Sequence, residues 1–236
     1  MTGKGRGDAS ALSATLREVS RRLERRFGAP DLCGHELSPV LNLVLTVLSQ
    51  NTNDANRDRA FASLRKRYPT IPRLAAARPA ELEEAIRVGG LARTKAAAIL
   101  SALSRLKEER GDYTLDFLRS VPLAEARAYL TSFAGVGVKT ANILLLFSLG
   151  HPAFPVDTHI LRVTKRLGLV PASATLSDAA LRLEPHVPEG AHVPLHLNLI
   201  RLGREVCKPR NPMCPSCPLL PLCPEGARAT GRRRPR

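Results

Sequence analysis

Four cysteines near the C-terminal end of the sequence carry a clear chemical signal. Their spacing is Cys207-x6-Cys214-x2-Cys217-x5-Cys223, which brings four thiols within 17 residues. Four thiolates suit either a zinc ion or an iron–sulfur cluster. Structural zinc sites usually use two close C-x2-4-C pairs, and the outer gaps here are wider. The spacing therefore favours a 4Fe–4S cluster as the cofactor, although it leaves zinc open.

The segment between the first two cysteines also carries positive charge. Lys208 and Arg210 lie there, and cations beside a cluster can contact a phosphate backbone. The fifth cysteine, Cys33, stands apart in the sequence, and we interpret it as a small core residue rather than a further ligand. No apolar run is long enough to span a bilayer, and no signal peptide follows Met1. We therefore expect an intracellular protein of the cytoplasm or nucleoid, without a membrane partner, in which clustered thiols stay reduced and bind metal.

A glycine-rich segment is predicted to form a tight turn between two helices. Gly135 and Gly137 flank Val136, so the backbone can turn sharply and approach a ligand closely. The helix that follows would point unpaired N–H groups and the positive end of its dipole outward, which suits a phosphate. On these residues alone, an ordinary helix–helix turn is the favoured interpretation.

Two side chains beyond this turn could carry catalysis. Lys139 lies in the first turn of the next predicted helix, where the dipole disfavours a cation and so favours a neutral amine. A neutral lysine amine is a nucleophile suited to Schiff-base chemistry. Asp157 follows eighteen residues later, just before Thr158, where it is expected to cap a helix. A capping side chain is held rigidly, which an active site also needs, so both roles are open to Asp157.

The sequence is strongly basic. It holds 36 Lys and Arg against 21 Asp and Glu, a formal net charge of +15. Residues 1–10 contribute +1 and residues 224–236 contribute +4, which leaves +10 on residues 11–223. A folded body with this charge is a candidate for a polyanionic partner, with nucleic acid first, against the alternative of a merely soluble basic surface. Hydrophobic residues make up 44% of the chain, which excludes a disordered polyelectrolyte.

Apolar periodicity predicts helices nearly throughout the chain. One stripe is formed by Leu12, Leu16, Val19, Leu23 and Phe27. Further helices are predicted over residues 39–50, 54–68, 79–88, 92–110, 114–120, 123–133, 138–149, 158–168, 176–185 and 194–206. We find no convincing strand alternation, so we expect an all-α fold of about ten helices.

Three motifs together resemble those of the helix-hairpin-helix DNA glycosylases, and most closely the endonuclease III family. They are F-A-G-V-G-V-K-T-A over residues 133–141, V-D-T-H over residues 156–159, and the four-cysteine motif, in the order and spacing of that family. The resemblance covers roughly residues 12–223. It implies that Lys139 is the catalytic nucleophile and that Asp157 is the carboxylate that assists it.

The resemblance also points to two loops that reach into DNA. In L-S-Q-N-T-N-D over residues 48–54, Gln50 or Asn51 would fill the gap left by an extruded base; in G-L-A-R-T-K-A over residues 90–96, Leu91 would act as a wedge. Locally, Asn51 could instead be a helix-end residue and Leu91 a satellite core residue. The implied DNA-binding residues are Gln50, Asn51, Leu91, Arg93, Lys95, Gly135, Gly137, Lys208 and Arg210.

The implied architecture is two helical domains flanking a DNA-binding cleft, across which Lys139 and Asp157 would face each other. One departure is Phe133-Ala134, where the family commonly has Leu-Pro, so the hairpin's entry is expected to be less rigid. The expected parts are a disordered tail over 1–10, a helical barrel domain over 32–150 with the hairpin motif at about 123–149, an iron–sulfur domain from 11–31 and 151–223, and a basic tail over 224–236.

The implied activity is base excision repair by a bifunctional DNA glycosylase and AP lyase. It would act as a monomer on double-stranded DNA with damaged bases, foremost oxidised pyrimidines, or with abasic sites. The Lys139 amine would attack the sugar C1′, and the Schiff base would allow β-elimination. Two alternatives are a monofunctional mismatch or adenine glycosylase, which typically lacks this lysine, and a non-catalytic hairpin protein, in which Lys139 and Asp157 would be free to vary.

Overall fold

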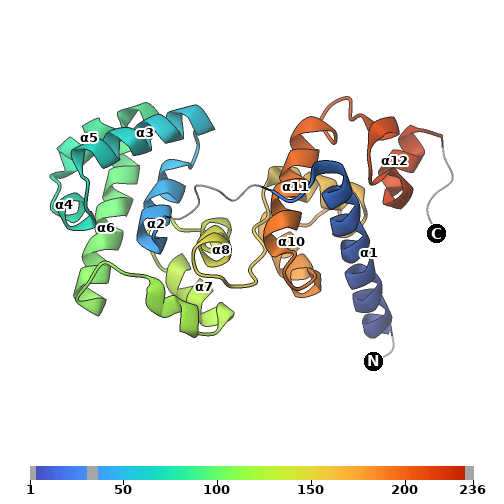
Figure 1. The fold of residues 1–236 in the computed structure, drawn as a ribbon, viewed down its shortest axis with the longest axis horizontal. Coiled ribbons are helices and arrows are strands. Elements are labelled where there is room, and N and C mark those ends of the chain that lie inside the picture. The colour runs from blue at the N-terminus through green and yellow to red at the C-terminus, as the bar shows by residue number, and fades with distance from the viewer. Residues whose placement is uncertain (1–3, 31–36, 232–236) are drawn as a thin grey trace. The chain divides into compact units, whose positions relative to one another are not determined.

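A computed structural model describes residues 4–30 and 37–231, and every regular element within them is a helix, with no strand (Figure 1). The predicted all-α class is confirmed. The chain divides into two compact units. We call Gly34–His151 the middle unit, and Met1–Cys33 together with Pro152–Arg236 the terminal unit. These bounds lie close to those expected from the sequence.

The helices of the middle unit begin where the sequence offers caps. The Ser38 hydroxyl accepts a hydrogen bond from the Leu41 amide, and the Asn53 side chain accepts one from the Asn56 amide, so each satisfies an amide that a helix start would leave unpaired. The elements are α2 Pro39–Leu48, α3 Asp54–Arg67, α4 Ile71–Ala75, α5 Pro79–Ile86, the short 3-10 turn η1 Arg87–Gly89, α6 Ala92–Arg110, η2 Asp116–Ser120, α7 Leu123–Thr131 and α8 Val138–Phe147.

Helix α6 is central to the packing of the middle unit. It contacts α2, α4 and α5, and α2 in turn packs on α8. Its buried face consists of Lys95, Ala96, Ile99, Ala102, Leu103 and Leu106, which recur at the spacing of one helix face. Lys95 on this face contacts the last residues of α2 and η1.

The terminal unit is built from both ends of the chain. Its elements are α1 Lys4–Phe27, α9 Thr158–Arg166, α10 Leu176–Leu183, η3 Glu184–His186, α11 His192–Glu205, η4 Cys214–Ser216, η5 Leu220–Leu222 and α12 Pro224–Ala229. Helix α1 lies against α11 (Figure 1). The predicted stripe on α1 is confirmed, because Leu12, Leu16, Val19 and Leu23 are buried and Phe27 packs against the same core.

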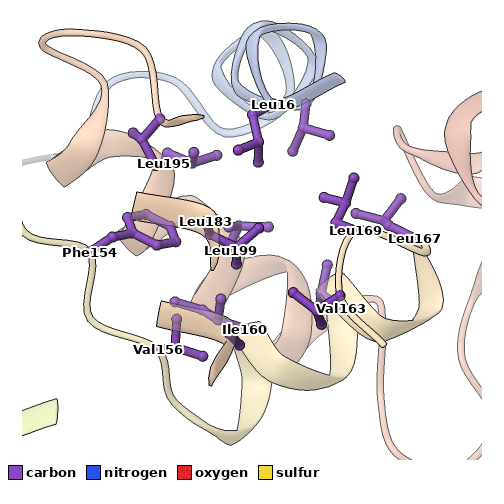
Figure 2. Close-up of a cluster of buried hydrophobic side chains, with 14 of the residues drawn as sticks. Leu16, Phe154, Val156, Ile160, Val163, Leu167, Leu169, Leu183, Leu195 and Leu199 are labelled. Carbon is purple, nitrogen blue, oxygen red and sulfur yellow. The ribbon is translucent and has the colours of Figure 1, made fainter. Parts of the chain in front are cut away.

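Leucine, valine and isoleucine side chains from four helices form the core of the terminal unit. Figure 2 shows Leu16 of α1 above Leu199 of α11, with Ile160 and Val163 of α9 below. Phe154 lies at the edge of this cluster and is fully buried. The core therefore anchors the segment that leads directly into α9.

The structure corrects three expectations. Residues 4–10 belong to α1 rather than to a disordered tail, because the helix continues outward beyond its apolar stripe. Helix α12 occupies the start of the expected basic tail, and α4 is a helix in the segment between residues 68 and 79, where none was predicted. In both, the proline occupies the first turn, where its missing N–H has no cost. Residues 232–236 and Cys33 lie outside the described residues.

Phe154→Ala should lower the free energy of unfolding by about 3–5 kcal/mol, since it removes a fully buried ring and leaves a cavity. Leu181→Ala is the matched control, because Leu181 is 60% exposed on α10. Urea denaturation followed by circular dichroism measures both. Equal stability of the two variants would contradict the packing described for Phe154.

Candidate functional site

A six-residue turn joins α7 to α8 in the middle unit. Val136 is buried and its amide donates to the Phe133 carbonyl at 3.1 Å, which closes the turn. Gly135 has φ +78°, a conformation that a side chain would strain, while Gly137 is in extended backbone with φ −85°. Both glycines are exposed, so the backbone of this turn is open to a ligand.

Lys139 is the second residue of α8 and its side chain is exposed. The helix begins after Gly137, which has no side chain to cap it. The first amides of α8 therefore point outward beside the lysine, at the positive end of the helix dipole. The helix start predicted at Val138 is thus present, with Lys139 in its first turn.

Side chains from α6 and α7 brace the entry to this turn. The Arg105 guanidinium lies 4.6 Å from the Phe133 ring centroid and 5.1 Å from that of Tyr129. It also donates to the Ser132 hydroxyl at 2.7 Å. The two rings meet edge to face with their centroids 5.3 Å apart. Cation–π and edge-to-face contacts of this kind are stabilising, so they help to hold Phe133 in place, and the less rigid entry stays a prediction.

Asp157 is fixed in the terminal unit as the N-cap of α9. Its Oδ1 accepts a hydrogen bond from the Ile160 amide at 2.8 Å, and the side chain is partly exposed. The segment before it is anchored, because the Phe154 amide donates to a Glu184 carboxylate oxygen at 2.9 Å and the Pro155 carbonyl pairs with His196 Nδ1 at 2.9 Å. The capping role expected from the sequence is confirmed, and one carboxylate oxygen has no hydrogen bond in the described residues.

The segment after α2 contacts the α7–α8 turn. Gln50 Nε2 donates to the Gly135 carbonyl at 2.8 Å. Asn51 is exposed and has φ +50°, a left-handed conformation that asparagine tolerates better than most residues. The structure thus brings Gln50 and Gly135, two of the predicted DNA-binding residues, directly together.

The segment after η1 presents an unusual leucine. Leu91 is 58% exposed and also has φ +50°, which is strained for a residue with a branched side chain. An exposed leucine in strained backbone is typical of a functional position rather than of a satellite core residue. Arg93 in the first turn of α6 is exposed as well.

Lys95 requires a correction. It is 2% exposed, and its Nζ donates to the carbonyls of Leu48 and Gly89, each at 2.8 Å. Burial lowers the pKa of its amine. A side chain enclosed in this way does not reach a phosphate, so Lys95 is not a DNA-contacting residue. Its place on the apolar face of α6, four residues before Ile99, is the sequence signal that pointed to burial.

The four cysteines of the C-terminal motif line one cavity of about 280 Å³. All four are free thiols and partly buried. Burial raises the pKa of Cys217 to about 11 and also raises that of Cys223. In the part of the chain that the structure describes, no group of His, Cys, Asp or Glu is arranged around a single metal ion. Lys208 and Arg210 are exposed on the adjoining segment.

Helix α9 connects Asp157 to this cysteine cavity through two arginines that sequence reasoning missed. Arg162 donates to the carbonyls of Cys207 and Gly203 at 2.9 and 2.8 Å. Arg166, one turn later, donates to the Cys207 Sγ at 3.3 Å and to the Lys208 carbonyl at 2.8 Å. Their spacing of four residues, which places both on one face of the helix that Asp157 caps, is the only signal in the sequence that they could contact the same segment.

Comparison with known proteins identifies the family. A model of the HhH-GPD superfamily of base excision DNA repair proteins matches residues 44–188. Endonuclease III of Thermotoga maritima is 35% identical over 208 residues, which are 88% of this chain and 92% of that protein. This chain belongs to the endonuclease III family. Endonuclease III of Sulfolobus acidocaldarius is 31% identical over 217 residues, covering 91% of this chain and 95% of that one.

Another relative, from Arabidopsis thaliana, is 40% identical over 169 residues, and the match spans only 58% of its length. Two solved endonuclease III–DNA structures have TM-scores of 0.76 at 32% identity. One is a trapped covalent intermediate with an estranged adenine, covering 92% of this chain and 98% of that one; the other is a non-covalent complex, covering 93% and 99%. The helix-hairpin-helix glycosylase fold is thus confirmed, and the protein is an endonuclease III-like base excision repair glycosylase.

Membership of the endonuclease III family agrees with the order of the three sequence motifs. The role of each residue within the site is a separate question, which is argued from the contacts of that residue.

Among the described residues, no helix has both the length and the apolar character that crossing a membrane requires. In the middle unit, Gln50 contacts the α7–α8 turn at Gly135, and the buried Lys95 contacts the ends of α2 and η1. The predicted cysteines gather around their cavity in the terminal unit.

Two substitutions at Asp157 separate its capping role from its charge. Asp157→Asn keeps a side-chain acceptor for the Ile160 amide and should leave stability close to that of the unmodified protein. Asp157→Ala removes the cap and should cost about 1 kcal/mol of unfolding free energy. Urea denaturation of both variants tests this. If the asparagine variant is as unstable as the alanine variant, the cap does not hold the helix start.

Proposed function

We propose that this protein is a bifunctional DNA glycosylase and AP lyase that removes oxidised pyrimidines from duplex DNA through a Schiff base at Lys139. The observation that carries the proposal is the exposed Lys139 at the start of α8, beside uncapped amides and a turn of two exposed glycines. A monofunctional glycosylase or a non-catalytic hairpin protein has no need of a lysine at this position.

The α7–α8 turn is the proposed anchor for the DNA backbone. The amides at the start of α8 and the open backbone at Gly135 and Gly137 offer donors to a phosphate, and the helix dipole favours the negative charge. The exposed cations Arg93, Lys208 and Arg210 would add contacts to further phosphates. These contacts position the duplex and carry no sequence preference.

A base must leave the stack before the lysine can reach its sugar, and a damaged base that pairs or stacks poorly lowers that cost. We assign Leu91 as the wedge between base pairs, because it is exposed and held in strained backbone. Gln50 or Asn51 would fill the space left in the duplex. Both lie beside the α7–α8 turn, which Gln50 contacts through the Gly135 carbonyl.

The chemistry begins with the neutral amine of Lys139. Its lone pair forms a bond to C1′ while the bond from C1′ to the base breaks, and the base leaves with that electron pair and gains a proton. Opening of the sugar gives a Schiff base between Nζ and C1′. Loss of a C2′ proton then expels the 3′ phosphate by β-elimination, and water releases Lys139. Asp157 would stabilise the positive charge that develops on the sugar or accept a proton, from its partly exposed carboxylate.

The cysteine cavity fits a 4Fe–4S cluster better than a single ion. It is lined by Cys207, Cys214, Cys217 and Cys223. Its volume of about 280 Å³ is several times the volume of one water molecule, about 30 Å³, so the cavity has room for a group larger than one ion. When bound, the cluster would supply four iron–thiolate bonds that tie the segment after α11. Arg162 and Arg166 then hold that segment against α9 and keep Lys208 and Arg210 at the surface.

Lys139→Gln should abolish borohydride trapping on abasic-site DNA, because the amide cannot form the Schiff base that borohydride reduces. Binding to the same duplex should largely survive, since the backbone donors remain. A gel assay of the reduced adduct measures the trapping, and a binding titration measures the affinity for the duplex. Lys66→Gln, at an exposed lysine in the last turn of α3, is the matched control and should trap normally. Undiminished trapping by the Lys139 variant would remove this residue from its proposed role.

The purified protein should contain about four iron atoms per chain and absorb visible light. Cys217→Ala should lose most of the iron, whereas Cys33→Ser should retain it. Metal analysis by mass spectrometry, together with the absorption spectrum, measures both. Stoichiometric zinc without iron would overturn the assignment of the cluster.

A further inference from the structure

Lys95 is a buried ammonium that the proposed reaction does not use. Its Nζ lies 2.8 Å from the Leu48 carbonyl, which is 47 residues away in the chain, and 2.8 Å from the Gly89 carbonyl. Only 2% of the residue is exposed. Burying a charge is costly unless hydrogen bonds satisfy it, so the two carbonyls must compensate for the water that this amine has given up.

Both carbonyls stand at the ends of helical elements. Leu48 is the last residue of α2 and Gly89 the last residue of η1. Carbonyls at helix ends lack partners within the helix and favour a cation. Lys95 therefore joins the ends of two helical elements between which, among the described residues, no backbone hydrogen bond runs.

Each of these ends leads directly into one of the loops proposed to enter DNA. Gln50 and Asn51 follow Leu48 by two and three residues, and Leu91 follows Gly89 by two. Asn51 and Leu91 both have φ +50° and are exposed. The strained backbone of Leu91 persists only where the surrounding structure fixes it, so the residues before it must be held in place.

Gly89 is fitted to this arrangement. A Cβ on it would lie 3.2 Å from the Ala60 Cβ and 3.9 Å from the Lys95 Nζ. The absence of a side chain lets the 3-10 turn approach α3 closely, which brings the Gly89 carbonyl within reach of the amine. Gln50 extends the connection to the Gly135 carbonyl of the α7–α8 turn.

We propose that Lys95 is a positioning residue that fixes the spacing between the Gln50–Asn51 loop and the Leu91 loop. The wedge, Leu91, and the residue that fills the gap, Gln50 or Asn51, then enter the duplex together when a base is extruded. This inference rests on the proposed function, in which both loops enter DNA. Lys95 itself touches neither DNA nor the reacting atoms.

The test compares Lys95→Met with Lys107→Met. Methionine has a similar length and no donor, so the first variant leaves both carbonyls without the ammonium. Lys107 lies on the same helix, is exposed, and donates to the Gly111 carbonyl at 2.7 Å, so its substitution controls for loss of charge on α6. Circular dichroism confirms that each variant is folded at the assay temperature.

Three readouts separate positioning from chemistry. The first is the single-turnover rate of base release from a duplex with one thymine glycol, which requires extrusion. The second is strand cleavage at an abasic site in single-stranded DNA, which requires the lysine chemistry but no extrusion. The third is the fluorescence of 2-aminopurine placed opposite an abasic-site analogue in duplex DNA, which rises when the filling loop disturbs its stacking.

Lys95→Met should slow base release on the order of 100-fold, as a displacement of about 1 Å at an active site can. It should also diminish the 2-aminopurine response, while cleavage of single-stranded abasic DNA stays at the unmodified level. Lys107→Met should match the unmodified protein in all three. Lys95→Arg keeps a cation with several donors and should recover part of the base release and of the fluorescence response.

Two results would overturn the inference. One is unmodified base release and fluorescence in Lys95→Met; the other is loss of base release and single-strand cleavage by the same factor, which would indicate general damage. If Lys95→Met does not fold, Lys95→Arg decides by the same criteria against the unmodified protein, with slower base release and intact single-strand cleavage as the supporting result. Absence of base release in the unmodified protein would instead contradict the proposed function.

Discussion

The beginnings of two helices are the constraint on which this molecule depends. A helix start fixes its first residues through backbone geometry and leaves several amides pointing outward. Lys139 is the second residue of α8, and Asp157 is the residue that caps α9. A base that leaves the stack is exposed only briefly, so groups held in place beforehand serve better than groups on a mobile loop. The two proposed catalytic side chains share this kind of support although they belong to different units.

Side chains packed around each helix start hold the neighbouring segments in place. In the middle unit, Arg105 contacts Phe133 at the entry of the α7–α8 turn. Gln50 links this turn to the segment after α2, and Lys95 links the end of α2 to the end of η1. In the terminal unit, buried Phe154 anchors the approach to Asp157, and Arg166 connects the far end of α9 to the cysteine segment. Rigid helices thus carry short exposed segments, and those segments offer the contacts that DNA would need.

The sequence predicted the helices well, since periodic apolar residues such as those of α1 report directly which face is buried. It also predicted the α7–α8 turn from two nearby glycines and the gathering of the cysteines from their close spacing, because both signals lie within a short stretch of sequence. It could not predict the tertiary partners of charged side chains. The resemblance placed Lys95 among the DNA-contacting residues, but its amine donates to the carbonyls of Leu48, 47 positions away, and of Gly89. The contact of Arg105 with Phe133 could not be predicted either, because Arg105 lies on α6 and Phe133 in the turn after α7, 28 positions later.

The site of attachment in the reduced protein–DNA adduct decides whether Lys139 is the nucleophile. After borohydride reduction on abasic-site duplex, protease and nuclease digestion leaves a sugar remnant on one peptide, and tandem mass spectrometry locates it. We predict the remnant on Nζ of Lys139, at the start of α8. Attachment to another lysine or to the N-terminal amine would contradict it.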